Sequence, residues 1–138
     1  MALYTASSTA SGGRQGKVQS SDGTLNLALS LPKGLGGNEK KGTTNPEQLF
    51  SAGYAACFDS ALQMVAGIAK KKITSQITAE ISIDKQSDGF GLSANLIAEI
   101  EGVSQAEAEE LVEKAHQACP YSRAINGNVS VTKTVNVK

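Results

Sequence analysis

The stretch ITAEISIDKQSDGFGLSANLIAEI occupies residues 77–100 and decides the fold class. Apolar side chains fall on every second position from Ile77, stop at Asp88-Gly89-Phe90-Gly91, and then resume the same alternation up to Ile100. A period of two is typical of a strand with one buried face, and a glycine-rich interruption is typical of a turn. The stretch therefore predicts a β-hairpin.

A helical pattern precedes the hairpin. Asn45 is a suitable N-cap residue, Pro46 suits the first helical position, and Glu47 adds favourable negative charge to the first turn. The residues that follow, up to Ile68, are so widely apolar that this helix is expected to be buried on nearly all sides. Gly53 is a candidate break that would divide the helix in two.

A second helical pattern follows the hairpin. Ser104-Gln105-Ala106-Glu107 matches the capping box that opens many helices, and this helix is expected to run to about Ala118 and to end against Cys119-Pro120. Asn126-Gly127 then turns the chain into a last strand. Four valines of that strand share one face: Val129, Val131, Val135 and Val137.

The N-terminal part has a β pattern. Within residues 12–31, an Asp22-Gly23 turn signal precedes leucines on every second position from Leu25 to Leu31. Residues 32–44 are rich in glycine and polar side chains, which predicts an exposed loop of the kind that often borders a functional site.

The order of these elements predicts an α+β fold with mainly antiparallel sheet packed around a buried central helix, because strands and helices do not alternate regularly. A length of 138 residues falls in the range of a single domain, expected to span 1–138. One small sheet cannot cover a helix that is apolar on nearly all sides, so we expect a homodimer to complete its burial.

Composition excludes several classes of protein. Hydrophobic residues make up 40% of the chain and charged residues 19%, which argues against a disordered protein. Thirteen basic and thirteen acidic residues cancel, so neither nucleic acid nor a membrane surface is an expected partner. The chain shows no signal-peptide pattern at Met1 and no run of the ~20 apolar residues that a spanning helix needs. A cytoplasmic location is therefore expected, where cysteines are usually thiols or transient redox pairs.

Two cysteines and one histidine are the candidate reactive groups. The absence of a Cys-x-x-Cys pair argues against a thioredoxin-like enzyme, and so few ligands make a weak metal set, so no cofactor is expected. From the residues alone, Cys57 and Cys119 fit small buried side chains better than reactive thiols. A Cys-His hydrolase would need His116, which is expected to be a surface residue because polar side chains surround it on its helix.

Several motifs closely resemble the organic hydroperoxide resistance proteins of the OsmC/Ohr superfamily, over nearly the whole chain. They are Gly12-Gly13-Arg14-Gln15-Gly16, Asn45-Pro46-Glu47-Gln48-Leu49-Phe50, Gly53-Tyr54-Ala55-Ala56-Cys57-Phe58, Asp88-Gly89-Phe90-Gly91-Leu92 and Cys119-Pro120-Tyr121-Ser122. The resemblance implies an OsmC-like fold completed by dimerisation, and a peroxidase that reduces alkyl and fatty-acid hydroperoxides. It also implies a dithiol reductant, namely lipoyl groups on proteins.

By the same resemblance, Cys57 is the peroxidatic cysteine, Cys119 is the resolving cysteine, and Arg14 and Glu47 form the polar pair that activates the site. Physical chemistry agrees with these roles, because a nearby guanidinium lowers the pKa of a thiol and a carboxylate can hold the planar guanidinium in place. A helix break at Gly53 would also place Cys57 near exposed backbone N–H groups that favour an anion.

The sequence departs from the family pattern at Arg123-Ala124-Ile125-Asn126 and lacks a proline near Glu101-Gly102. Neither departure touches the four assigned residues. Two other readings stay open. One is an OsmC-like peroxidase that prefers hydrogen peroxide, and the other is a non-catalytic thiol redox sensor or binding protein of the same fold.

Overall fold

The computed structural model describes all residues from 1 to 138 and contains two compact units, Met1–Leu49 and Phe50–Lys138. The single domain expected over 1–138 stays a prediction. None of the helices combines the length with the apolar character that crossing a membrane requires.

The first unit contains a small antiparallel sheet in the order β1-β2-β3, formed by β1 (Ser8–Ser11), β2 (Lys17–Ser20) and β3 (Asn26–Ala28). The strand expected from the alternating leucines is shorter than predicted, since Leu25 is 44% exposed and the ladder ends at Ala28. The loop expected over residues 32–44 contains one short 3-10 helix, η2 (Lys33–Leu35).

Helix α1 (Pro46–Ile68) begins where the sequence predicts. The side chain of Asn45 accepts a hydrogen bond of 2.8 Å from the backbone N–H of Gln48, which is the contact of an N-cap residue. The predicted break at Gly53 is wrong, because α1 is continuous over its 23 residues. Gly53 serves a close approach instead: a Cβ atom at this position would lie 2.9 Å from the Tyr121 hydroxyl oxygen.

Within the chain, α1 buries one face and not its whole circumference. Met64 is 52% exposed and Ile68 is 75% exposed on the other side. The buried side chains recur with the helical period and are Tyr54, Phe58, Ala61, Leu62, Val65 and Ala66.

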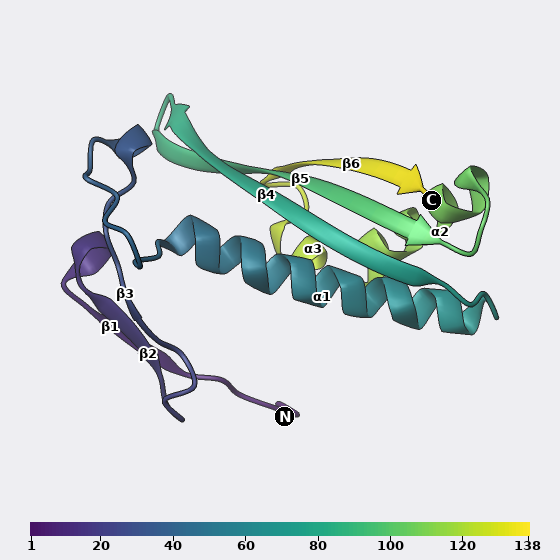
Figure 1. The fold of residues 1–138 in the computed structure, drawn as a ribbon, viewed down its shortest axis with the longest axis horizontal. Helices are drawn as coiled ribbons and strands as arrows, with labels where there is room; N and C mark the ends of the chain where they lie inside the picture. Colours follow the sequence, from purple (N-terminus) through teal and green to yellow (C-terminus); the bar gives the residue numbers. More distant parts are fainter. The chain divides into compact units, whose positions relative to one another are not determined.

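The second sheet has the order β4-β5-β6, with β4 (Thr74–Gln86) antiparallel to β5 (Gly89–Glu101). The predicted hairpin is confirmed, but its turn is tighter than expected, because Gly89 pairs with Gln86 and β5 starts there. Strand β6 (Ser130–Val137) pairs parallel with β5, which makes this sheet mixed (Figure 1). A parallel neighbour requires a crossover connection, and the intervening helices supply it.

The crossover consists of α2 (Gln105–Ala118) and α3 (Pro120–Ile125). The predicted capping box at the start of α2 is present, with Ser104 and Glu107 bonded reciprocally. Cys119 ends α2 as predicted. The sequence does not predict the short helix α3. Proline after Cys119 indicates the end of α2, but here Pro120 also occupies the first position of a new helix.

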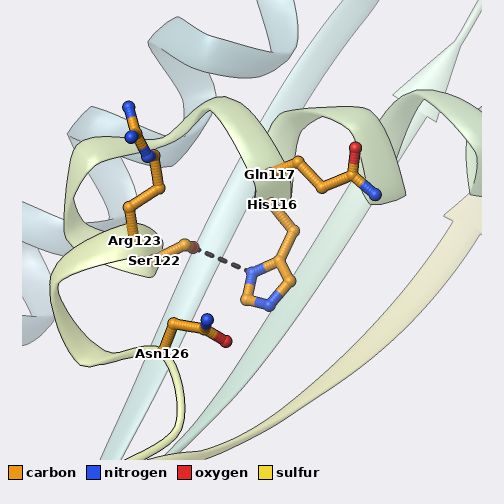
Figure 2. A pocket seen from close by; sticks show the side chains of 5 residues that line it. All are labelled: His116, Gln117, Ser122, Arg123 and Asn126. Atoms are coloured by element: carbon orange, nitrogen blue, oxygen red, sulfur yellow. Dashed lines mark hydrogen bonds between the residues drawn. The ribbon is translucent and has the colours of Figure 1, made fainter.

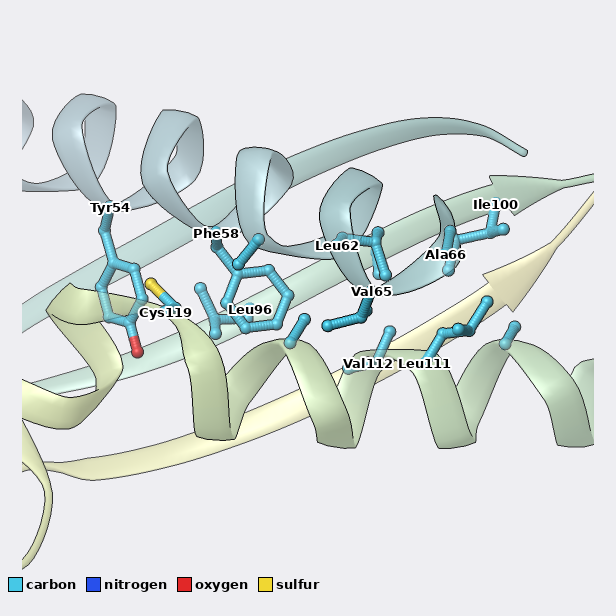
Figure 3. Packing of buried hydrophobic residues seen from close by; sticks show 14 of the residues in the cluster. Tyr54, Phe58, Leu62, Val65, Ala66, Leu96, Ile100, Leu111, Val112 and Cys119 are labelled. Atoms are coloured by element: carbon cyan, nitrogen blue, oxygen red, sulfur yellow. The ribbon is translucent and has the colours of Figure 1, made fainter. Parts of the chain in front are cut away.

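The core of the second unit lies where α1 and α2 pack together against β5. Figure 3 shows the side chains of the two helices meeting in the space between them, with the strands behind. Tyr54, Phe58, Leu62, Leu96 and Ile100 are almost completely buried there. Cys119 belongs to this core, so the fold places one thiol at the end of a dry apolar layer.

We predict that Gly53 and Gly67, both on α1, respond differently to alanine. Alanine is favoured over glycine in a helix by about 1 kcal/mol, and a Cβ atom at Gly67 would meet no atom within 4 Å. Gly67→Ala should therefore raise the free energy of unfolding in urea. Gly53→Ala should be less stabilising by at least about 1 kcal/mol, because the ring of Tyr121 must move. Equal gains in the two variants would contradict the close contact.

Candidate active site

The two cysteines lie side by side although 62 positions separate them in the sequence. Cys57 is on α1, Cys119 is at the joint between α2 and α3, and their sulfur atoms are 3.6 Å apart. Both are free thiols; Cys57 is partly exposed and Cys119 is completely buried. An external molecule can therefore reach Cys57, whereas the Cys119 thiol is not accessible.

The surroundings of the Cys57 sulfur within its own unit favour the thiol over the thiolate. Burial raises the pKa of Cys57, and Cys119 beside it raises this pKa further, whereas a hydrogen bond from the backbone of Tyr121 lowers it. None of these influences is a cation. The N–H group comes from the first turn of α3 and not from a second segment of α1, so the predicted helix start near Cys57 is corrected.

Aromatic rings line the segment that carries Cys57. The rings of Phe50 and Tyr54 are stacked with centroids 5.8 Å apart, and Tyr121 lies 6.1 Å from Phe50 and 5.9 Å from Tyr54. Phe58 meets Tyr54 edge to face at 6.4 Å. Two of these rings, Tyr54 and Phe58, are buried, whereas Tyr121 is 38% exposed.

Arg14 and Glu47 form a two-point ion pair in the first unit. Their two hydrogen bonds measure 2.7 and 2.6 Å, and the Arg14 side chain is 33% exposed against 14% for Glu47. Arg14 sits on η1 (Gly13–Gln15), a single turn closed by Gly16, where a Cβ atom would lie 1.7 Å from the Ser11 carbonyl oxygen. Only glycine fits there, so the turn that presents Arg14 depends on it.

The ion pair shifts the pKa values of Arg14 and Glu47 so that the charged form of each is favoured. Hydrogen bonding to Arg14 lowers the pKa of Glu47, and the same bond raises the pKa of Arg14. Because the pKa of Glu47 is lowered by folding, the pair is fully formed above the ordinary value of 4.5 and is lost as the pH falls through the lowered pKa.

The four residues singled out from the sequence thus form two pairs, one in each compact unit. His116, expected at the surface, is half-buried. Its Nδ1 atom lies 2.9 Å from the Ser122 hydroxyl, and burial lowers its pKa. Ser122 in turn lies 2.6 Å from the hydroxyl of Tyr54. The sequence analysis missed this network of hydrogen bonds, although Tyr54 and Ser122 both belong to the motifs quoted above.

A pocket of about 430 Å³ lies beside this network of hydrogen bonds and is lined by His116 and Ser122 (Figure 2). Figure 2 shows the imidazole of His116 directed toward Ser122, while the Arg123 guanidinium points away from the ring. The other residues that line the pocket are Gln117 and Asn126.

Comparison with known proteins gives consistent matches. The model of the OsmC-like protein family matches residues 36–134. The organic hydroperoxide resistance protein OhrA of Bacillus subtilis is 49% identical over 135 residues, which cover 96% of each chain. A crystal structure of an organic hydroperoxide resistance protein OsmC from Legionella pneumophila is 50% identical, covers 99% of this chain and 100% of its own, and has a TM-score of 0.93.

A Vibrio cholerae protein, described as a putative organic hydroperoxide resistance protein with captopril bound in one of its active sites, is 45% identical. Its structure covers 99% of this chain and 94% of its own, with a TM-score of 0.91.

Proposed function

Because this chain belongs to the OsmC-like protein family, and within it to the organic hydroperoxide resistance proteins, we propose that it is a thiol-dependent peroxidase that acts on organic hydroperoxides. The observation that carries the proposal is the cysteine pair. One thiol is accessible, the other is buried, and only 3.6 Å separates their sulfur atoms.

The proposed cycle has three steps: oxidation of Cys57, formation of a disulfide with Cys119, and reduction of that disulfide. The Cys57 thiolate attacks one peroxide oxygen, the O–O bond breaks, and the leaving alkoxide takes a proton to become an alcohol, which leaves a sulfenic acid on Cys57. The Cys119 sulfur then attacks the Cys57 sulfur, and hydroxide leaves with the Cys119 proton as water. An external dithiol finally reduces the disulfide by exchange and is itself oxidised.

The spacing of the sulfur atoms suits the second step. A disulfide bond measures about 2.05 Å, so the pair must close by roughly 1.5 Å from its separation of 3.6 Å. Cys119 is a core residue at the joint between α2 and α3, so this movement takes place at the end of the core. The two sulfur atoms are already close enough for a small movement to bring them into bonding distance.

We assign Arg14 and Glu47 the task of activating Cys57. A peroxidatic cysteine must react as the thiolate, yet burial raises the pKa of Cys57 and no cation of its own unit opposes this. A guanidinium can supply the missing charge, and its two-point bond to Glu47 leaves further N–H donors free.

The proposed substrates are alkyl and fatty-acid hydroperoxides. Of the aromatic cluster near Cys57, Phe50 and Tyr121 are not buried, and these two rings favour a hydrocarbon chain over a small polar peroxide such as hydrogen peroxide. The proposed reductant is a dithiol carried by a lipoylated protein, in keeping with the family.

We predict that Cys57→Ser abolishes turnover of tert-butyl hydroperoxide with dihydrolipoamide, because a hydroxyl stays protonated near neutral pH. Cys119→Ser should permit one oxidation and then leave sulfinic or sulfonic acid on Cys57, visible by mass spectrometry. Glutathione and hydrogen peroxide are the control reductant and the control oxidant. A wild-type protein that is oxidised once and never turns over would instead favour a redox sensor.

Arg14→Lys keeps the charge but loses the planar fork, and Glu47→Gln loses the anchor of that fork. Both variants should raise the pKa of Cys57 and slow its oxidation, by about tenfold for each pKa unit near neutral pH. Lys17→Gln removes a neighbouring cation outside the pair and is the matched control. Values of pKa and rate equal to those of the wild type in both variants would show that the pair is structural.

We infer that the partner on the exposed face of α1 is a second copy of the chain. Small or apolar side chains recur along this face, which no other element of the unit Phe50–Lys138 covers: Ala52, Ala56, Ser60, Met64 and Ile68. We expect light scattering to give the mass of a homodimer at micromolar concentration, and Met64→Lys to weaken it. A monomeric wild-type protein would refute this assembly.

A further inference from the structure

A buried chain of hydrogen bonds joins the three helices that hold the cysteines. It runs from the Tyr54 hydroxyl on α1 to the Ser122 hydroxyl on α3, at 2.6 Å, and from there to Nδ1 of His116 on α2, at 2.9 Å. Tyr54 is 0% exposed and Ser122 is 2% exposed. Buried hydroxyls of this kind are normally hydrogen-bonded, and here each has a partner within the protein.

This network of hydrogen bonds is placed to control the distance between the sulfur atoms of Cys57 and Cys119. Each of its members stands three positions from a cysteine: Tyr54 before Cys57, His116 before Cys119, and Ser122 after Cys119. On α1, Tyr54 and Cys57 lie about one helical turn apart. Cys119 itself is the non-helical residue between α2 and α3, so His116 and Ser122 flank it on the two helices that it joins. The hydrogen bond from Ser122 to His116 spans the joint between α2 and α3, and the bond to Tyr54 ties that joint to α1.

One assignment gives both hydroxyl protons of the network an acceptor within it. Tyr54 donates to Ser122, and Ser122 donates to Nδ1 of His116. In this assignment His116 is neutral, with its proton on Nε2. A proton on Nδ1 would leave one of the two hydroxyl protons without an acceptor in the network.

The charged groups near His116 agree with a neutral ring. Burial is the main cause that lowers the pKa of His116, the Lys133 side chain on β6 lowers it further, and Glu113 on α2 opposes both. Lys133 and Glu113 form an ion pair of 3.0 Å, so their effects on the ring offset each other in part. Arg123 on α3 lines the same pocket, but its guanidinium points away from the ring (Figure 2).

We propose that the chain of Tyr54, Ser122 and His116 is a positioning network for disulfide formation, in which His116 acts as a neutral acceptor that holds the joint of α2 and α3. It rests on the dithiol cycle proposed above. In that cycle Cys119 displaces water from the Cys57 sulfenic acid, and the network keeps the attacking sulfur within a short movement of its target. His116 and Ser122 are positioning residues and touch neither the peroxide nor a reacting atom.

The test separates the two oxidation steps. Reduced protein is mixed with one equivalent of tert-butyl hydroperoxide; sulfenic acid is trapped in a Cys119→Ser background, and disulfide is followed by acid quench and mass spectrometry. His116→Leu and Ser122→Ala should slow disulfide formation by about tenfold, since small misplacements of reacting groups are costly. Sulfenic acid formation should slow less than disulfide formation, because Cys57 stays in place on α1 and only the hydrogen bond from the Tyr121 N–H on α3 is affected.

Three controls make the result specific. His116→Asn offers an acceptor near the position of Nδ1 and should restore most of the rate. Gln117→Leu, on the adjacent exposed position of α2, should match the wild type. Disulfide formation in the wild type should also lose rate as the pH falls below 6.5, the ordinary pKa of histidine, when the ring gains a proton, and His116→Asn should lack this extra loss.

Wild-type rates of disulfide formation in folded His116→Leu and Ser122→Ala would overturn the proposal. Should these variants fail to fold, nitrogen NMR of the one histidine in the chain decides, because a proton on Nδ1 in the reduced wild type contradicts the network. Oxidation by diamide forms the same disulfide without a peroxide. A wild-type protein inert to hydroperoxides would refute the proposed function, while the diamide rates would still test the network.

Discussion

The close approach of the α2–α3 joint to α1 is the contact on which the cysteine site depends. Gly53 allows it, because a Cβ atom there would lie 2.9 Å from the Tyr121 hydroxyl oxygen. One residue later, Tyr54 bonds to Ser122 and fills the core beneath the joint. With the two segments held at this distance, the sulfur atoms of Cys57 and Cys119 come within 3.6 Å. A bulkier residue at position 53 would push these segments apart.

The same packing creates a conflict between protection and reactivity. Burial shields Cys119 and most of Cys57 from water, but it also raises the pKa of Cys57, so the reactive thiolate becomes scarcer. The N–H group of Tyr121 offsets part of this cost. A full positive charge offsets more, which is why a guanidinium held by a carboxylate is a sensible complement to a buried thiol. The first unit contains such a pair in Arg14 and Glu47.

Local signals in the sequence predicted the local structure, and the errors arose where distant segments meet. The hairpin, the cap at Asn45 and the capping box at Ser104 depend on neighbouring residues and were predicted correctly. The break at Gly53 was wrong, because the reason for this glycine is a ring 68 positions away in the sequence. The hydrogen bond of His116 was missed for the same reason: the polar neighbours on its helix suggested solvent, whereas its partner lies on α3, which was not predicted.

Burial, and not intrinsic reactivity, sets the order of events in the proposed cycle. Both sulfur atoms belong to cysteine, yet only Cys57 is accessible from outside, so the peroxide must meet it first. The same difference in accessibility determines how the disulfide is reduced in the proposed cycle. A dithiol reductant can reach only the Cys57 sulfur of the disulfide, and its attack there releases Cys119 as a thiol. Cys119 therefore needs no path to solvent at any stage, and the apolar core around it can stay closed throughout turnover.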